Sequence, residues 1–244
     1  MLYGLDLFSG IGGITKGLEQ WVKPIAYCEQ DKYCQAVLAN RIIDGSLPNA
    51  PIWDDVKTLE GKMLPVKPDI IYGGFPCQDI SVCGNQKGID GERSGLFFEI
   101  VRLIEEVRPE FVFLENVPNI RTKGLDRVIQ EFTRLRYDFR WTIVSAAEVG
   151  APHVRKRWFL LADANIKGLE GGENTGRIKS GGEKFVEFPT GQGEPFKREN
   201  WQIEPDVGRM VDGLPFRVDR IKALGNAVVP EQVSQAFKKL LCME

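Results

Sequence analysis

A cysteine in a rigid loop is the residue of this chain best suited to nucleophilic chemistry. Residues 73–81 read Gly-Gly-Phe-Pro-Cys-Gln-Asp-Ile-Ser and follow the apolar run 70–72, which has the character of a buried strand. Pro76 fixes its own φ and favours an extended Phe75, which directs the Cys77 side chain. Because a thiol is a strong nucleophile near neutral pH, the loop predicts a catalytic cysteine. Taken alone, it fits a buried, inert cysteine equally well.

A glycine-rich turn after the first predicted strand indicates a ligand site. Residues 2–8 form an apolar strand, and Ser-Gly-Ile-Gly-Gly at 9–13 leads into a helical stretch that ends near Trp21. Glycines admit a ligand close to the backbone, and a helix start offers unpaired N–H groups. Glu29 ends the next predicted strand, where an acid can bind ribose hydroxyls. The turn does not match Gly-x-Gly-x-x-Gly, which favours an adenosine-containing ligand without a pyrophosphate over NAD.

Strand-like and helical segments alternate along the rest of the chain. The strand-like segments are 25–27, 70–72, 111–114, 141–147 and 158–162, and we expect the last two to pair. The helical segments are 31–41, 94–107 with Ser94 as its cap, 125–135, and 230–241. This alternation predicts an α/β fold with a parallel or mostly parallel sheet.

The pattern is interrupted between residues 163 and 208, a stretch with nine glycines and few aliphatic residues. Such a composition buries little apolar surface, so it predicts a small appendage or a mobile loop region. We therefore divide the chain into a catalytic and cofactor-binding domain at 1–162, a short region at 163–208, and a segment at 209–244 that returns to the first domain.

Composition excludes several classes of protein. Five cysteines without Cys-x-x-Cys spacing and a single histidine argue against a zinc site or a disulfide framework, and predict a cytoplasmic protein without a metal. The sequence has no run of 18 apolar residues, so we expect no membrane association, and from its first residues we expect no signal peptide. Residues 1–120 carry 11 Lys and Arg against 17 Asp and Glu, whereas residues 121–244 carry 21 against 17. A polyanion, if one binds, would therefore meet the second half, although an uneven solvated surface explains the asymmetry nearly as well.

Six blocks in order resemble motifs of the DNA cytosine-5 methyltransferases, and the resemblance covers nearly the whole chain. The blocks are residues 6–13, the Pro-Cys loop at 73–81, Ser-Gly-Leu-Phe-Phe at 94–98, Glu-Asn-Val at 115–117, Arg-Lys-Arg at 155–157, and residues 220–230 with Gly-Asn-Ala-Val-Val. The resemblance implies a Rossmann-like methyltransferase fold, S-adenosylmethionine as cofactor, and a short target-recognition region at 163–208.

The resemblance also implies a set of binding residues. Phe8 is expected to stack on the adenine, Glu29 to bind the ribose, and Asp55 to receive the adenine amino group, with Asp54 as a rival. The implied cofactor-binding residues are Asp6, Phe8, Ser9, Gly10, Gly12, Gly13, Glu29, Gln30, Asp55, Val56, Pro76, Leu96, Asn226 and Ala227. The implied substrate-binding residues are Gln78, Ser81, Asn116 and Arg121.

The implied chemistry assigns a role to each catalytic residue. C5 of cytosine is a poor nucleophile, so the Cys77 thiolate would add to C6 and make C5 enamine-like. Glu115 would stabilise or protonate N3, and Arg155 would hold O2 and support the catalytic loop. Arg157 is the fourth catalytic candidate, with a structural role as the alternative. The target base must leave the helix stack to meet the thiol, which implies base flipping.

The expected partner is double-stranded DNA, bound by a monomer, with a cognate restriction endonuclease as a possible companion. Candidate phosphate contacts are Arg121, Lys123, Arg155, Lys156 and Arg177, and candidates for base readout are Arg177, Lys179, Gln192 and Trp201. We expect residues 163–208 to be only partly ordered without DNA.

Three alternatives remain open. The first is methylation of tRNA, although the chain lacks the Cys-Phe-Thr tripeptide of that branch of the family. The second is a catalytically silent DNA-binding relative, which would be expected to lose Cys77 or Glu115. The third is a small-molecule thiol enzyme, which would not need the Arg-x-Arg block or Asn226.

Overall fold

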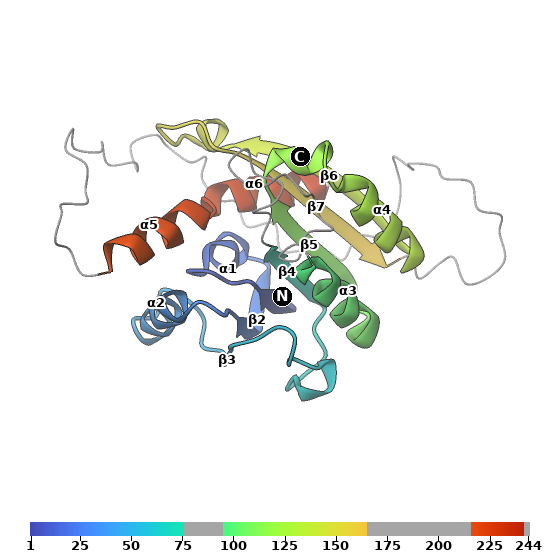
Figure 1. The fold of residues 1–244 in the computed structure, drawn as a ribbon, viewed down its shortest axis with the longest axis horizontal. Coiled ribbons are helices and arrows are strands. Elements are labelled where there is room, and N and C mark those ends of the chain that lie inside the picture. The colour runs from blue at the N-terminus through green and yellow to red at the C-terminus, as the bar shows by residue number, and fades with distance from the viewer. Residues whose placement is uncertain (76–94, 165–215, 242–244) are drawn as a thin grey trace.

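The computed structural model describes residues 1–75, 95–164 and 216–241. Its centre is a seven-stranded sheet in the order β3-β2-β1-β4-β5-β7-β6 (Figure 1). The strands are β1 (Leu2–Leu7), β2 (Val22–Cys28), β3 (Ile52–Trp53), β4 (Ile70–Gly74), β5 (Phe111–Asn116), β6 (Tyr137–Ser145) and β7 (Lys156–Ala164).

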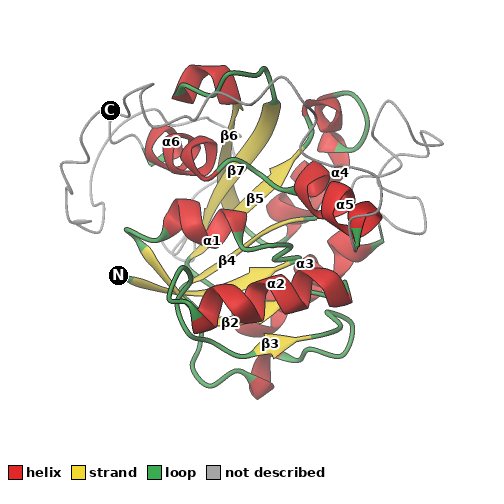
Figure 2. Ribbon diagram, turned by 90° about the vertical axis from the view of Figure 1, so that its left-hand side faces the viewer, coloured by secondary structure: helices red, strands yellow, loops and turns green. Residues whose placement is uncertain are grey.

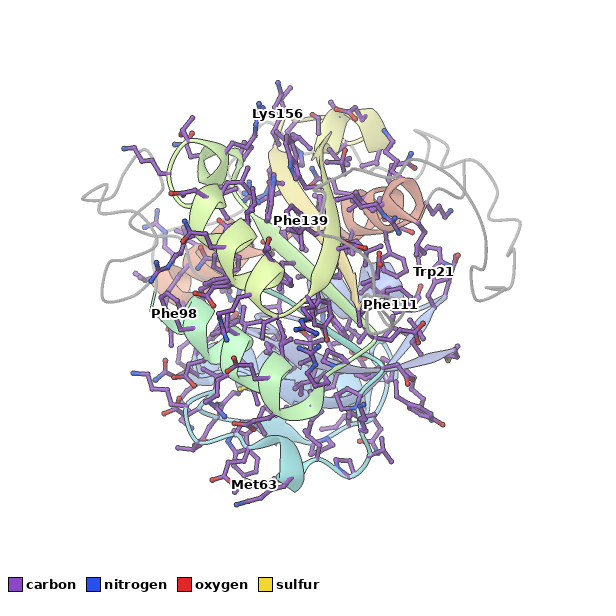
Figure 3. All side chains as sticks on the ribbon, turned by 90° about the vertical axis from the view of Figure 1, so that its right-hand side faces the viewer. Trp21, Met63, Phe98, Phe111, Phe139 and Lys156 are labelled. Carbon is purple, nitrogen blue, oxygen red and sulfur yellow. The ribbon has the colours of Figure 1, made fainter. Side chains whose placement is uncertain are left out.

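The described helices are α1 (Gly13–Leu18), α2 (Lys32–Ile43), α3 (Leu96–Val107), α4 (Leu125–Arg134), α5 (Arg217–Asn226) and α6 (Pro230–Leu240), with short 3-10 turns at η1 (Gly61–Met63), η3 (Pro118–Arg121) and η4 (Ala146–Val149). Met63 and Lys156 mark opposite extremes of the molecule in Figure 3, one near the β3 edge of the sheet and the other at the start of β7.

Six strands of the sheet run parallel, and β7 runs against its neighbours β5 and β6. This arrangement confirms the prediction of a mostly parallel, Rossmann-like sheet and the predicted pairing of the last two strands. The strand order reverses between β1 and β4. In open parallel sheets, ligands bind outside the carboxyl ends of the strands at such a reversal.

Two apolar cores cover the two faces of the sheet. One contains Phe97 and Ile104 of α3 with Val128 and Phe132 of α4, and the other contains Leu18 of α1 with Val233 and Phe237 of α6. Helices α1, α2 and α6 lie on one side of the strands, and α3 and α4 lie on the other (Figures 1 and 2). Burial on both faces explains why the central strands read as continuous apolar runs.

Several element boundaries differ from the predicted ones. β6 begins at Tyr137 and ends at Ser145, whereas the predicted strand continued to Ala147. The reason is a capping box, in which Ser145 accepts from the Ala147 amide and Glu148 accepts from the Ser145 amide, so that η4 begins there. β3 was not predicted, because two residues carry no periodicity. The predicted cap Ser94 lies outside the described residues.

The last helix returns to the first part of the chain. α6 packs against α1, β6 and β7. Gln232 of α6 is fully buried and donates to the carbonyls of Val144 and Arg155, at 2.9 and 2.6 Å.

The domain division itself stays a prediction, because residues 165–215 lie outside the described part. The strand β7 continues to Ala164, beyond the predicted boundary at 162.

Candidate active site

A cavity of about 690 Å³ opens at the carboxyl ends of the parallel strands, at the point where the strand order reverses. Its lining comes from the residues that follow β1, β2, β4 and β5, and from the end of α5 and the segment after it. The position is the one that the parallel sheet predicts for a ligand site.

The glycine-rich turn forms one wall of the cavity. Phe8, Gly10 and Gly12 adopt positive φ angles of 55°, 55° and 84°. Phe8 is not glycine, so its backbone is strained at a position where the side chain lines the cavity. A Cβ atom on Gly10 would have nothing within 4 Å, so a ligand can approach the backbone there.

Glu29 is held in one orientation beside this turn. One carboxylate oxygen accepts from the Gly10 amide and the other from the Asp31 amide, each at 2.7 Å. Burial raises the pKa of Glu29, and these hydrogen bonds oppose the rise. α2 supports the arrangement, because Arg41 donates to the Ile11 carbonyl at 2.6 Å and Gln35 donates to the Glu29 carbonyl at 2.5 Å.

Asp6 lies behind the cavity wall and is fully buried. Thr15 donates to one of its carboxyl oxygens at 2.6 Å, and the Tyr72 hydroxyl lies 2.8 Å from the Thr15 hydroxyl. Among the described residues, the other carboxyl oxygen has no hydrogen-bond partner. Burial raises the pKa of Asp6 to about 8, although the hydrogen bonds from Thr15 and Ser9 lower it.

Glu115 is the last residue but one of β5 and lines the opposite wall. Its carboxylate lies 2.8 Å from the Arg157 guanidinium, and both side chains are almost completely buried. Burial raises the pKa of Glu115 to about 7, while the charges of Arg157 and Arg155 and the hydrogen bond from Arg157 lower it. A Cβ atom on Gly74 would lie 2.7 Å from the Glu115 carboxylate, so a larger residue there would force the acid to shift. The site therefore holds a carboxyl group that can donate or accept a proton near neutral pH.

Two polar side chains hold the segments that flank Glu115. The buried amide of Asn116 donates to the Phe75 carbonyl at 3.3 Å and accepts from the Val117 amide at 2.7 Å. Arg155 donates to the carbonyls of Gly225 and Ala227, at 2.7 and 2.6 Å. These bonds tie the start of the segment after β4 and the end of α5 to the centre of the sheet.

The structure brings most of the predicted site residues together. Those that line the cavity are Phe8, Ser9, Gly10, Gly13, Glu29, Gln30, Asp55, Val56, Leu96, Glu115, Asn116, Arg157, Asn226 and Ala227. Asp55 lines it and its rival Asp54 does not. The predicted site residues that lie outside the lining are Asp6, Gly12, Arg121 and Arg155.

Arg121 lies on the surface and stacks over the Trp141 ring, 5.2 Å from its centroid. Several predicted residues fall outside the described part of the chain: Pro76, Cys77, Gln78, Ser81, Arg177, Lys179, Gln192 and Trp201.

Two lining residues with opposite charges were not predicted. Asp31 caps α2 by accepting from the amides of Tyr33 and Cys34, and Lys222 of α5 donates to its other oxygen at 2.5 Å. Asp31 directly follows the predicted pair Glu29–Gln30, and this position in the sequence could have been used to predict that it lines the cavity. Lys222 is 191 residues away in sequence, so only the fold could place it there.

The described residues include no group of His, Cys, Asp and Glu side chains that could hold a metal ion. In the same part of the chain, no helix is both long and apolar enough to cross a membrane. Cys28 and Cys34 are unbridged and buried.

The fold and the site define the chain as a member of an enzyme family. Residues 2–194 match the family of C-5 cytosine-specific DNA methylases, and the chain belongs to that family.

Individual relatives agree with this assignment. The type II methyltransferase M.CviJI of Paramecium bursaria Chlorella virus IL3A is 36% identical over 159 residues, which cover 65% of this chain and 42% of the relative. The type II methyltransferase M.HhaI of Haemophilus parahaemolyticus is 34% identical over 174 residues, which cover 68% and 51%. The chain thus spans about half the length of these relatives.

The fold is also that of a solved structure. The S. pombe Dnmt2 methyltransferase superimposes with a TM-score of 0.54 at 23% identity, over 73% of this chain and 59% of that one. At this level of identity the likeness supports the fold alone.

Proposed function

We propose that this protein transfers a methyl group from S-adenosylmethionine to C5 of a flipped cytosine in duplex DNA. The observation that carries the proposal is the buried Glu115–Arg157 pair, which faces the same cavity as Glu29 and Phe8. One wall of the cavity offers groups suited to an adenosine, and the other offers an acid suited to a base. A single cavity of this kind can hold a methyl donor beside its acceptor.

The first wall fits the proposed cofactor. The fixed Glu29 carboxylate can accept from ribose hydroxyls, Asp55 can accept from an adenine amino group, and Phe8 presents an aromatic ring. The end of α5 supplies Asn226 to the same cavity. The bound cofactor would supply an electrophilic methyl group on a sulfonium.

The second wall fits a cytosine ring. Glu115, with a pKa near 7, can donate a proton to N3 as charge develops there. Arg157 is held beside Glu115, where it can donate to the neighbouring O2 atom. From the sequence we expected Arg155 to hold O2 of the cytosine. The guanidinium of Arg155, however, already binds two carbonyls, and the residue lies outside the cavity lining. We therefore assign O2 to Arg157 and give Arg155 a positioning role.

Cys77 completes the proposed mechanism. It lies outside the described residues, but it follows Phe75 by two positions, and Phe75 lines the cavity beside Asn116. Two residues of chain span at most about 7 Å, so we expect the thiol to lie near the cavity. The thiolate would add to C6, and the electron pair that reaches C5 would take the methyl group as its bond to the sulfonium sulfur breaks, which would leave a neutral thioether. A base then removes the C5 proton, and Cys77 leaves.

The proposed substrate is double-stranded DNA, because the chain belongs to the family of C-5 cytosine-specific DNA methylases. The excess of Lys and Arg over Asp and Glu after residue 120 supports a polyanion at the second half of the chain. A monomeric state and a cognate restriction endonuclease belong to the same proposal.

Transfer of a labelled methyl group tests this function directly. Wild-type protein should label duplex DNA at cytosine C5 and leave tRNA unlabelled. Cys77→Ser should abolish transfer and also abolish covalent trapping on DNA that carries 5-fluorocytosine, whereas Cys83→Ser serves as the matched control and should retain both. Near-normal transfer by Cys77→Ser would refute the mechanism, and labelling of tRNA alone would refute the substrate.

A further inference from the structure

The end of α5 forms a separate wall of the cavity, and this helix buries little apolar surface. Ala223 is the buried residue of this helix, while Ile221, Leu224 and Asn226 are exposed. Lys222, Ala223, Gly225 and Asn226 all line the cavity. Because little apolar surface holds the helix down, its polar contacts decide how firmly this wall is placed.

One of these contacts crosses the cavity rim. Lys222 Nζ lies 2.5 Å from Asp31 Oδ2, and both residues line the cavity. The other oxygen of Asp31 caps α2 through the amides of Tyr33 and Cys34. Asp31 thus joins two helices that border the cavity from opposite ends of the described chain.

The same contact leads directly to Glu29. The Asp31 amide donates to one Glu29 oxygen, and the Gly10 amide donates to the other. A chain of polar contacts therefore runs from Lys222 through Asp31 and Glu29 to the glycine-rich turn. A substitution of Lys222 should therefore alter the placement of Glu29, the acid proposed to bind the ribose.

The solvent exposure of the Lys222–Asp31 pair indicates that its effect is local. The Lys222 side chain is 56% exposed and the Asp31 side chain 27% exposed. Ion pairs in such surroundings add little to global stability. Their local effect can still be large where they hold a weakly packed element, because that element opens at a small cost.

We infer that Lys222 and Asp31 form a latch that closes α5 over the bound cofactor and slows its release. The inference rests on the proposed function, since it requires S-adenosylmethionine to occupy this cavity. Both residues are positioning residues, and neither takes part in the chemical step. When the latch opens, Lys222 moves away from Asp31 while Arg155 still holds the end of α5 at Gly225 and Ala227, and the cofactor leaves through the gap at the Lys222 side.

The variants that test the latch preserve the rest of each side chain. Lys222→Met keeps the aliphatic stem and removes the charge. Asp31→Asn also removes the charge, and asparagine caps a helix as well as aspartate does. Lys222→Arg retains a cation and should restore much of the effect. Lys16→Met is the matched control, because Lys16 pairs with Glu19 at the same distance of 2.5 Å on the surface of α1, outside the cavity lining.

The measured quantity is the rate at which labelled S-adenosylmethionine is displaced by excess unlabelled cofactor, without DNA. Lys222→Met and Asp31→Asn should each raise this rate at least fivefold, and the double variant should be no faster than either single variant. The KM for cofactor should rise more than kcat changes. The unfolding temperature should shift by less than about 4 °C, as expected for an exposed pair. Salt should speed release from the wild type and not from Lys222→Met.

Three results would overturn the latch. The first is an unchanged release rate in both single variants while wild-type protein binds the cofactor. The second is additive effects in the double variant, which would mean that each residue contacts the cofactor independently. The third is an equal effect of Lys16→Met. A wild-type protein that binds no S-adenosylmethionine would refute the proposed function, and with it the latch.

Discussion

Arg157 Nε lies 2.8 Å from Glu115 Oε1, and this contact joins the antiparallel strand β7 to the end of β5. The pair is almost completely buried, yet the pKa of Glu115 is still raised to about 7. Burial therefore outweighs the attraction of the guanidinium. The acid is poised between its two protonation states at neutral pH, and its state depends on Arg157.

Removal of Arg157 should destabilise the protein more at high pH than at low pH. In Arg157→Met the pKa of Glu115 rises further, so at pH 8.5 the folded variant must either hold a buried carboxylate with only the Arg155 charge nearby or keep the acid protonated at a free-energy cost, whereas at pH 6 the acid is neutral. Breaking a buried pair costs about 3–5 kcal/mol when the remaining group stays charged. Urea unfolding at the two pH values measures the difference.

Arg140→Met is the control for this experiment. Arg140 lies 3.6 Å from Asp163 in a pair that is about one third exposed, so its loss should cost less than about 1 kcal/mol at either pH. Equal destabilisation of Arg157→Met at pH 6 and pH 8.5 would show that Glu115 does not titrate in this range.

Asp6→Asn should flatten the dependence of stability on pH. The pKa of Asp6 is raised from 3.8 to about 8, so the folded protein binds this proton more tightly than the unfolded chain does. The stability that this group contributes is complete below about pH 4 and is lost as pH rises towards 8, at up to about 1.4 kcal/mol per pH unit. Asparagine cannot ionise, so unfolding free energies measured from pH 4 to pH 8 should show a shallower slope. Parallel profiles for the variant and the wild type would exclude a raised pKa.

Glu29→Ala should weaken the binding of S-adenosylmethionine by about 1–3 kcal/mol, the usual cost of losing a charged hydrogen bond in a buried site. The variant also frees the amides of Gly10 and Asp31, so its unfolding should be measured without ligand for comparison. Glu19→Ala on the surface of α1 is the control and should bind normally. A dissociation constant unchanged by calorimetry would reject Glu29 as the ribose-binding acid.

Gly17→Ala should destabilise the contact between the first and last helices. A Cβ atom at this position would lie 2.5 Å from both the Pro230 carbonyl and the Val233 Cβ atom. Overpacking of this kind costs about 1–3 kcal/mol, measurable by urea unfolding. Gly225→Ala in α5 is the matched substitution in open space and should be neutral or slightly stabilising. Similar losses in both variants would contradict a packing effect specific to Gly17.

The sequence predicted the sheet and most of the cavity lining because local signals carried them. Residues 111–114 read as a buried strand, and the acid that follows, Glu115, fell at the correct strand end. The roles of Arg155 and Arg157 could not be told apart from the sequence, since they depend on contacts with residues remote in the chain: Arg155 binds the carbonyls of Gly225 and Ala227, and Arg157 pairs with Glu115. No pattern in the sequence placed Lys222 at the cavity, because its partner Asp31 is remote in sequence. β3 was too short to show a period.

The contact between α1 and α6 has a consequence for how the protein is made. Trp21 and Phe237 lie with their ring centroids 5.4 Å apart, so apolar residues near the start of the chain are covered by residues near its end. While the ribosome is still adding the later strands, Ile14, Leu18 and Trp21 lack the helix that shields them. Exposed apolar surface of this kind promotes aggregation of incomplete chains. Nascent chains that stop short of α6 are therefore expected to bind chaperones, and release should follow synthesis of Phe237.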